Sequence, residues 1–225
     1  MEFARATLEN CHEATGTVVV IDVLRAFTTA CYAFHAGVEE ILLVYDIDEA
    51  LAVRDTLVDC FVMGEDGGRP IQGFDYDNSP AQFVHANLRG KRLIQRTSNG
   101  VQGVIRSSRA ERVLAGSFVC AGATVDLLRA RNPESVTFVI TGWEDGEEDA
   151  ACADYMEALL RAENPDPSAY LDRVWTSWNG RRFSDPAIDF LPAGDLPLCT
   201  ALDRFDFAME VKRQDGLLHM KRCYA

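Results

Sequence analysis

The chain has 225 residues, of which 48% are hydrophobic and 25% charged, and its formal net charge is −13. This length and balance are typical of a globular protein with a substantial core. The excess of acidic residues disfavours nucleic acids and anionic membrane surfaces as partners, because affinity for phosphodiesters depends on cationic neutralisation. No stretch reaches the roughly 20 apolar residues that a membrane span requires.

The seven cysteines are scattered, and none forms a C-x-x-C pair. Zinc ribbons and disulfide frameworks need closer spacing, so this pattern favours reduced thiols and a cytoplasmic protein. The N-terminal segment MEFARATLENCHEATG contains no apolar core of signal-peptide length, which fits the same expectation.

Strands and helices alternate from Thr17 to Glu163. The run TVVVID, residues 17–22, is continuous and β-branched, as in a strand buried on both faces. Further strands are predicted at 39–46, 60–65, 91–99, 111–118 and 135–143, and helices at 23–37, 48–58, 79–90, 101–108, 121–131 and 149–163. This alternation predicts a three-layer α/β/α fold with a largely parallel or mixed sheet.

The chain after Glu163 has a different character. The segment NPDPSAY, residues 164–170, has the composition of a linker turn, and residues 175–199 contain three prolines and little periodicity. This second segment fits either a wrapping of the core or an interface, so a homo-oligomer is one possible arrangement. Residues 205–224 predict a C-terminal hairpin around Asp215-Gly216. We expect one domain over residues 1–225, with 130–135 as a possible subdomain boundary.

Polar residues follow the predicted strands at the end where α/β sheets bind their ligands. Asp22 ends the first strand and Arg25 follows three residues later. These two residues fit a helix N-cap with a surface arginine, and equally a metal ligand or nucleophile with an arginine that clamps an anion.

Two further segments reach the same edge of the predicted sheet. Glu65 ends the third strand and opens a glycine-rich, acidic loop over residues 64–80. Ser98, Asn99 and Gly100 place a hydroxyl and backbone N–H groups at a helix start, which suits phosphate but also fits a plain Asn-Gly turn. The chain contains no P-loop, dinucleotide fingerprint or G-x-S-x-G motif.

An acidic run, residues 144–149, precedes the helix at 149–163. Asp149 shares a helical face with Cys152 and Met156, so we expect its carboxylate to point towards the sheet. There it could meet the carboxylates of Asp22 and Glu65, and such a cluster suits Mg²⁺.

Several ordered motifs carry a family resemblance: VVVIDVLRAFTTA at 18–30, GEDGGRPIQGFDYDNSP at 64–80, RTSNG at 96–100 and AGSF at 115–118. With them the sequence resembles the 2-phosphosulfolactate phosphatase family. The resemblance implies a Mg²⁺-dependent phosphatase fold and a small anionic phosphorylated substrate. The reaction would convert 2-phosphosulfolactate to sulfolactate and phosphate in coenzyme M biosynthesis.

The motif positions and their chemistry suggest a role for each candidate residue. We expect Asp22, Arg25 and Asn99 to be catalytic, and Asp22, Glu65 and Asp149 to bind the metal. The residues expected to bind phosphate are Arg25, Asn78, Ser79, Ser98, Asn99 and Gly100.

Two departures from the family pattern bear on the substrate. Asp66 stands where the family usually has arginine, which predicts the loss of a cation from the pocket, and Trp143 replaces a small residue. Two alternatives therefore stay open: a phosphatase for another small phosphorylated acid, or a non-catalytic anion-binding or regulatory protein on the same scaffold.

Overall fold

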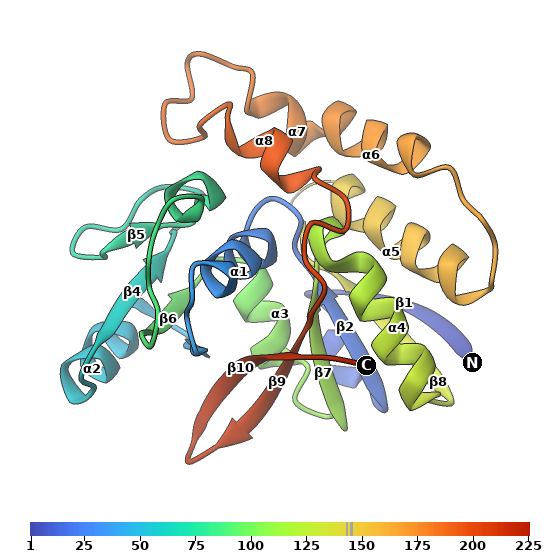
Figure 1. Ribbon diagram of the computed structural model, residues 1–225, viewed down its shortest axis with the longest axis horizontal. Helices are drawn as coiled ribbons and strands as arrows, with labels where there is room; N and C mark the ends of the chain where they lie inside the picture. The colour runs from blue at the N-terminus through green and yellow to red at the C-terminus, as the bar shows by residue number, and fades with distance from the viewer. Residues whose placement is uncertain (143, 145) are drawn as a thin grey trace.

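Figure 1 shows the computed structural model, which describes residues 1–142, 144 and 146–225. The strands are β1 Glu2–Thr7, β2 Thr17–Ile21, β3 Glu40–Leu43, β4 Cys60–Gly64, β5 Tyr76–Asp77, β6 Arg92–Arg96, β7 Arg112–Gly116, β8 Ser135–Ile140, β9 Ala208–Gln214 and β10 Leu217–Cys223. The α-helices are α1 Ala26–His35, α2 Ile47–Thr56, α3 Gly100–Arg106, α4 Ala121–Arg131, α5 Glu147–Leu160, α6 Pro167–Thr176, α7 Trp178–Arg182 and α8 Asp195–Cys199. Short 3₁₀ helices are η1 Cys11–Glu13, η2 Pro80–Phe83 and η3 Phe118–Cys120.

The described strands form one mixed sheet of ten strands in the order β1-β8-β2-β7-β9-β10-β3-β6-β4-β5. The four strands from β1 to β7 in this order are parallel to one another, and so are the four from β3 to β5. The predicted C-terminal hairpin, β9 and β10, lies between these halves and is antiparallel to β7 on one side and to β3 on the other. The α/β prediction is therefore confirmed, with a mixed sheet.

Strand β2 shows why the fold has three layers. All five of its residues are buried. Strands β7 and β8 pair with its two edges, and helices cover both of its faces. Val18 and Val20 face the core beneath α1 and α3, whereas Val19 and Ile21 face the core beneath α4 and α5. A continuous apolar run is the sequence that such a doubly covered strand requires.

The hairpin and the twist of the sheet together bring distant strand ends into contact. The reversals at β9, β10 and β3 make the two halves run in opposite senses. Five neighbouring steps separate β2 from β6, and at about 20–25° a step the twist exceeds a right angle. The carboxyl ends of β2 and β6 meet as a result, and the Gly100 N–H donates a 3.0 Å hydrogen bond to Asp22.

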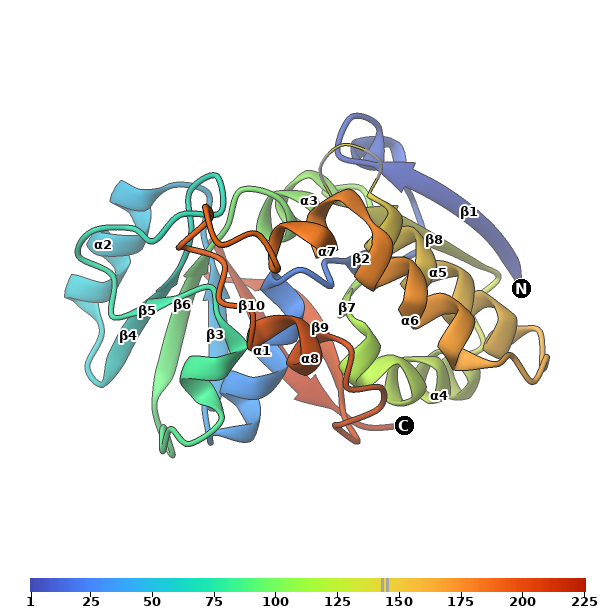
Figure 2. The same ribbon diagram turned by 90° about the horizontal axis from the view of Figure 1, so that it is seen from above.

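The C-terminal helices lie across this meeting point. Figures 1 and 2 show α6, α7 and α8 passing from α5 over the top of α1 towards β5. The far end of this crossing is held by Arg69, whose guanidinium lies 4.2 Å from the centroid of the Phe190 ring. Residues 175–199 therefore wrap the core, which was one of the two expectations from the sequence.

Two local predictions were wrong, and two strands were not predicted. Residues 164–170 are not a linker turn throughout, because Asp166 caps α6 and Pro167 begins it. The helix predicted at 79–90 is only the four-residue η2, and Ser79 does not cap it through its side chain. Strand β1 was not predicted, since most of its residues are exposed and, among the described strands, it pairs with β8 alone. Strand β5 was not predicted because it has only two residues.

Two features concern composition rather than topology. All seven cysteines are free thiols. In the described part of the chain, no helix combines the length and apolar character needed to cross a bilayer.

Candidate active site

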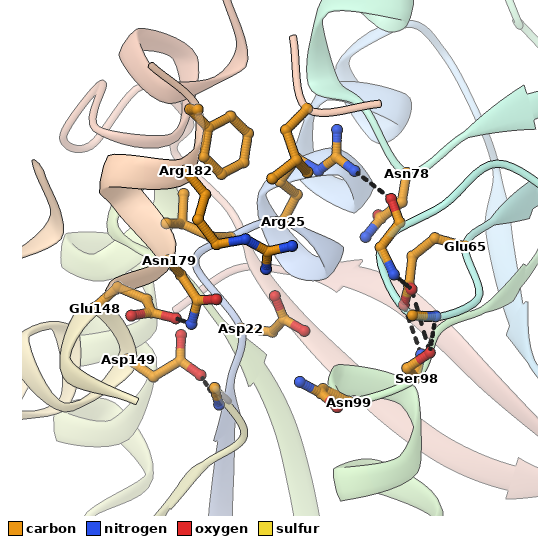
Figure 3. Close-up of a pocket in the computed structure, with 16 residues that line it drawn as sticks. Asp22, Arg25, Glu65, Asn78, Ser98, Asn99, Glu148, Asp149, Asn179 and Arg182 are labelled. Atoms are coloured by element: carbon orange, nitrogen blue, oxygen red, sulfur yellow. Dashed lines mark hydrogen bonds between the residues drawn. The ribbon is translucent and has the colours of Figure 1, made fainter. Parts of the chain in front are cut away.

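One cavity of about 70 Å³ lies between the carboxyl ends of β2, β4 and β6, the start of α5, and α7 (Figure 3). Its size admits a small ligand with few waters. The predicted site residues that line it are Asp22, Arg25, Glu65, Asn78, Ser98, Asn99 and Asp149. Ser79 and Gly100 were also predicted but do not line this cavity.

Asp22 lies at the centre of the cavity wall and is 6% exposed. Its two oxygens accept backbone hydrogen bonds from Ala26 (2.9 Å) and Gly100 (3.0 Å). A Cβ on Gly100 would lie 2.7 Å from an Asp22 oxygen, so only glycine allows this approach. Burial, followed by repulsion from the carboxylates of Glu65 and Glu148, raises the pKa of Asp22 to about 7.

Arg25 is nearly buried and forms a 2.8 Å ion pair with Asp195, which is fully buried. The second Asp195 oxygen accepts a 2.8 Å hydrogen bond from the Ser79 hydroxyl. Asp195 thus holds both the arginine of the β2–α1 turn and the end of the 64–80 loop. It was not predicted, because it lies in a segment without periodicity and its partners are far away in sequence.

Glu65 organises the loops after β4 and β6. Its carboxylate accepts hydrogen bonds from the Ser98 N–H (2.6 Å), the Gly68 N–H (2.5 Å) and the Ser98 hydroxyl (3.2 Å). The N–H groups of Ser98 and Gly100 are therefore both bonded to carboxylates in this structure.

Asn78 lies beside Arg25 and Glu65 in Figure 3 and is 4% exposed. Its Oδ1 atom has no hydrogen-bond partner in the described part of the chain. A buried amide oxygen without a donor is costly, so a ligand or water that donates a hydrogen bond to it would be stabilising.

Asp149 points into the protein, as its helical position predicts. Its carboxylate accepts hydrogen bonds from the N–H groups of Val23 (2.8 Å), Thr141 (3.1 Å) and Gly142 (2.8 Å), and from the Thr141 hydroxyl (3.2 Å). It thereby ties the ends of β2 and β8 to α5. Burial, then the charges of Glu148 and Asp22, raise its pKa.

The sequence interpretation missed three polar side chains that line the cavity. Glu148 is as buried as Asp149 and accepts a 2.6 Å hydrogen bond from the Asn179 amide. Asn179 and Arg182 come from α7. Glu148 belongs to an acidic run that usually faces solvent, and α7 has too few residues to show a helical pattern.

Of the two departures from the family pattern, Asp66 lies outside the cavity. Its side chain is 61% exposed and pairs with Arg96 at 2.8 Å. Asp66 therefore adds no charge of its own to the lining of this cavity. Trp143 lies outside the described residues.

The carboxylate oxygens that line the cavity can be compared with the ligands that Mg²⁺ requires. Within residues 1–142, 144 and 146–225, no group of three or more His, Cys, Asp or Glu residues is assembled to hold a metal. Mg²⁺ commonly uses only one or two carboxylates, completed by water and substrate phosphate. Asp22, Glu65 and Glu148 line one cavity and interact through their charges, so their oxygens fit such a site.

Comparison with known proteins places the chain in a family. The family model described as 2-phosphosulpholactate phosphatase matches residues 4–214. A protein of Bacillus subtilis named probable 2-phosphosulfolactate phosphatase is 36% identical over 200 residues, which cover 88% of this chain and 87% of that protein. A protein of the same name from Carboxydothermus hydrogenoformans is 32% identical over 89% of this chain and 88% of its own length. The chain therefore belongs to the 2-phosphosulfolactate phosphatase family.

Proposed function

We propose that this protein is a Mg²⁺-dependent phosphatase that hydrolyses 2-phosphosulfolactate to sulfolactate and phosphate, a reaction of coenzyme M biosynthesis. Family membership and the names of the relatives support the reaction class and the substrate. The observation that carries the proposal is the cavity at the strand ends, where Asp22, Arg25 and Asn99 from two of the resembling motifs lie together.

The charge of the cavity supports a metal requirement. Among the described residues, four carboxylates line it, against the two arginines Arg25 and Arg182, and Arg25 is already paired with Asp195. A dianionic phosphomonoester would meet net negative charge there without a further cation. Mg²⁺, held by Asp22 with Glu65 or Glu148, would neutralise phosphoryl oxygens when bound.

The residues that line the cavity have different roles in the proposed reaction. The backbone N–H groups of Ala26 and Gly100 fix the orientation of Asp22. Asp22 either attacks phosphorus and displaces the alcohol oxygen, forming an acyl phosphate that water then hydrolyses, or takes a proton from the water that displaces this oxygen. In both cases the departing alcohol takes up a proton from solvent. Arg25 and the amides of Asn78 and Asn99 hold the phosphoryl oxygens. Asp149 keeps the strand ends together, because its oxygens accept four hydrogen bonds from protein groups.

Phosphate release from 2-phosphosulfolactate and a panel of other phosphomonoesters, with Mg²⁺ or with EDTA, tests the proposal. We expect turnover that requires Mg²⁺ and falls about 1,000-fold or more in Asp22→Asn. Asp66→Asn is the matched control, since this exposed carboxylate lies outside the cavity and should leave the rate unchanged. Absence of turnover on every ester would favour a binding protein, and full activity of Asp22→Asn would contradict the mechanism.

A further inference from the structure

The helix α7 brings a second cation into the cavity. Arg182 lines the wall opposite Asn99, and Figure 3 shows its guanidinium directed into the cavity. Among residues 1–142, 144 and 146–225 no carboxylate forms an ion pair with Arg182, and its guanidinium lies 4.6 Å from the Trp178 ring centroid. Arg25, in contrast, is neutralised by Asp195.

Three contacts fix α7, and therefore the position from which Arg182 reaches into the cavity. The Ser177 hydroxyl caps α7 by accepting a 2.8 Å hydrogen bond from the Gly180 N–H. Gly180 packs so closely that a Cβ would lie 1.9 Å from the Val174 carbonyl oxygen. Asn179 donates to the buried carboxylate of Glu148 at 2.6 Å.

Arg182 comes from a different part of the chain than the groups that we assign to phosphate. Asp22 and Asn99 come from the strand ends, which carry the resembling motifs. The cavity is also lined by the apolar side chains of Leu24, Phe183 and Leu191, and the Phe183 ring centroid lies 5.6 Å from the Arg25 guanidinium. A cavity that combines these apolar side chains with a second arginine suits a short carbon skeleton that bears a charged substituent.

We propose that Arg182 binds an anionic substituent on the carbon skeleton of the substrate, a carboxylate or a sulfonate, and so determines which phosphomonoesters are turned over. The proposal rests on the proposed function, because it assumes that the phosphoryl group of the substrate binds next to Asp22. The planar guanidinium can donate two parallel hydrogen bonds to either kind of anion. The negative charge of the protein makes this cation effective as a filter for anionic substituents.

Three phosphate esters of secondary alcohols distinguish whether Arg182 binds the carboxylate, the sulfonate or neither. 2-Phosphosulfolactate carries a carboxylate and a sulfonate, 2-phospholactate carries only the carboxylate, and isopropyl phosphate carries neither. For Arg182→Ala we expect kcat/KM to fall about 100-fold with 2-phosphosulfolactate, mostly through KM, and less than about threefold with isopropyl phosphate. A comparable loss with 2-phospholactate would identify the carboxylate as the bound group, and retention of activity would identify the sulfonate.

Two variants control for charge and folding. Arg181→Ala removes an exposed arginine from the same helix and should behave as the unchanged protein. Arg182→Lys keeps the charge but loses the paired donors, so we expect an intermediate loss of about tenfold. An equal loss on all three esters would overturn the inference, because it would place Arg182 on the phosphoryl group.

Calorimetry makes the inference testable even if no ester is hydrolysed. Sulfolactate and lactate bear the same substituents but no phosphoryl group. We expect sulfolactate, lactate or both to bind the unchanged protein, and Arg182→Ala to weaken that binding at least tenfold. Binding that is unaffected by the substitution, or no binding of either acid, would overturn the inference. Failure of the proposed function would instead appear as no turnover by the unchanged protein.

Discussion

The carboxylates at the strand ends differ in the number of hydrogen bonds that they accept from the protein. Asp149 receives four hydrogen bonds, three of them from backbone N–H groups at the ends of β2 and β8. Asp22 receives two and faces the cavity. The spacing of Asp149 on its helix predicted that it points inward. The spacing could not predict its partners, because these come together only when the sheet forms.

Replacing Asp149 with alanine should lower the free energy of unfolding by about 2–4 kcal/mol, because three buried N–H groups lose their acceptor. Denaturant unfolding followed by circular dichroism measures this change. Asp172→Ala, at an exposed position of α6, should change stability by less than about 0.5 kcal/mol. A similarly small effect of Asp149→Ala would contradict the role of Asp149 as a structural acceptor.

The raised pKa of Asp22 predicts a pH dependence of stability in the metal-free protein. Between about pH 4 and 7 an unfolded aspartate is ionised, whereas buried Asp22 keeps its proton until about pH 7. The unfolded state then binds fewer protons than the folded state, so the free energy of unfolding falls as the pH rises through this window.

Asp22→Asn cannot ionise and should be free of this loss. In EDTA we expect the variant to gain stability relative to the unchanged protein between pH 4 and 8, by about 2–4 kcal/mol. Thermal unfolding at a series of pH values measures the gain. A stability difference that is independent of pH would show that Asp22 titrates normally.

At the scale of elements, local signals predicted β2, β3, β4, β6, β7, β8 and most of the helices between them. They missed the two-residue β5 and failed around α6 and α7. Asp166 accepts a 3.0 Å hydrogen bond from the Ser168 N–H, and Pro167 occupies the first helical position. The same two residues also fit a turn, so composition alone did not distinguish the two structures. The role of α7 could not be predicted, because it depends on contacts between α7 and α5 and on a strand end far away in sequence.

Gly180→Ala tests whether the packing of α7 positions the cavity wall. The new Cβ would lie 1.9 Å from the Val174 carbonyl oxygen, so α7 must move. We expect a loss of about 1–3 kcal/mol in stability and at least a tenfold fall in kcat/KM on 2-phosphosulfolactate.

Gly194→Ala provides the matched control, since a Cβ there meets no atom within 4 Å and its backbone suits alanine. This variant should retain both stability and activity. If Gly180→Ala were as active as Gly194→Ala, the position of α7 would not matter for turnover.

At the scale of the whole molecule, the C-terminal hairpin joins the two halves of the sheet. The Asp-Gly turn and the flanking apolar residues predicted the hairpin itself. Its place between β7 and β3 follows from pairings with residues 41–43 and 113–115, far earlier in the chain. Strand order depends on such distant pairings, and a single sequence does not reveal them.

Because both halves depend on the hairpin, they should lose stability together when it is weakened. Met220 is fully buried in β10, pairs with Ile41 of β3 and packs in the core shared with β2. We expect Met220→Ala to cost about 2–4 kcal/mol. Hydrogen exchange should show the same loss of protection for the slowest amides of β2 and of β6, because both open only when the whole sheet unfolds.

Tyr224→Ala, at an exposed position just after β10, controls for general effects at the C-terminus and should leave protection unchanged. If Met220→Ala lowered protection in β6 but not in β2, the halves would be separate cooperative units. The cavity between β2 and β6 could then open without unfolding of either half. Equal losses would instead mean that the cavity-lining groups at the ends of β2 and β6 stay in register for as long as the hairpin is paired.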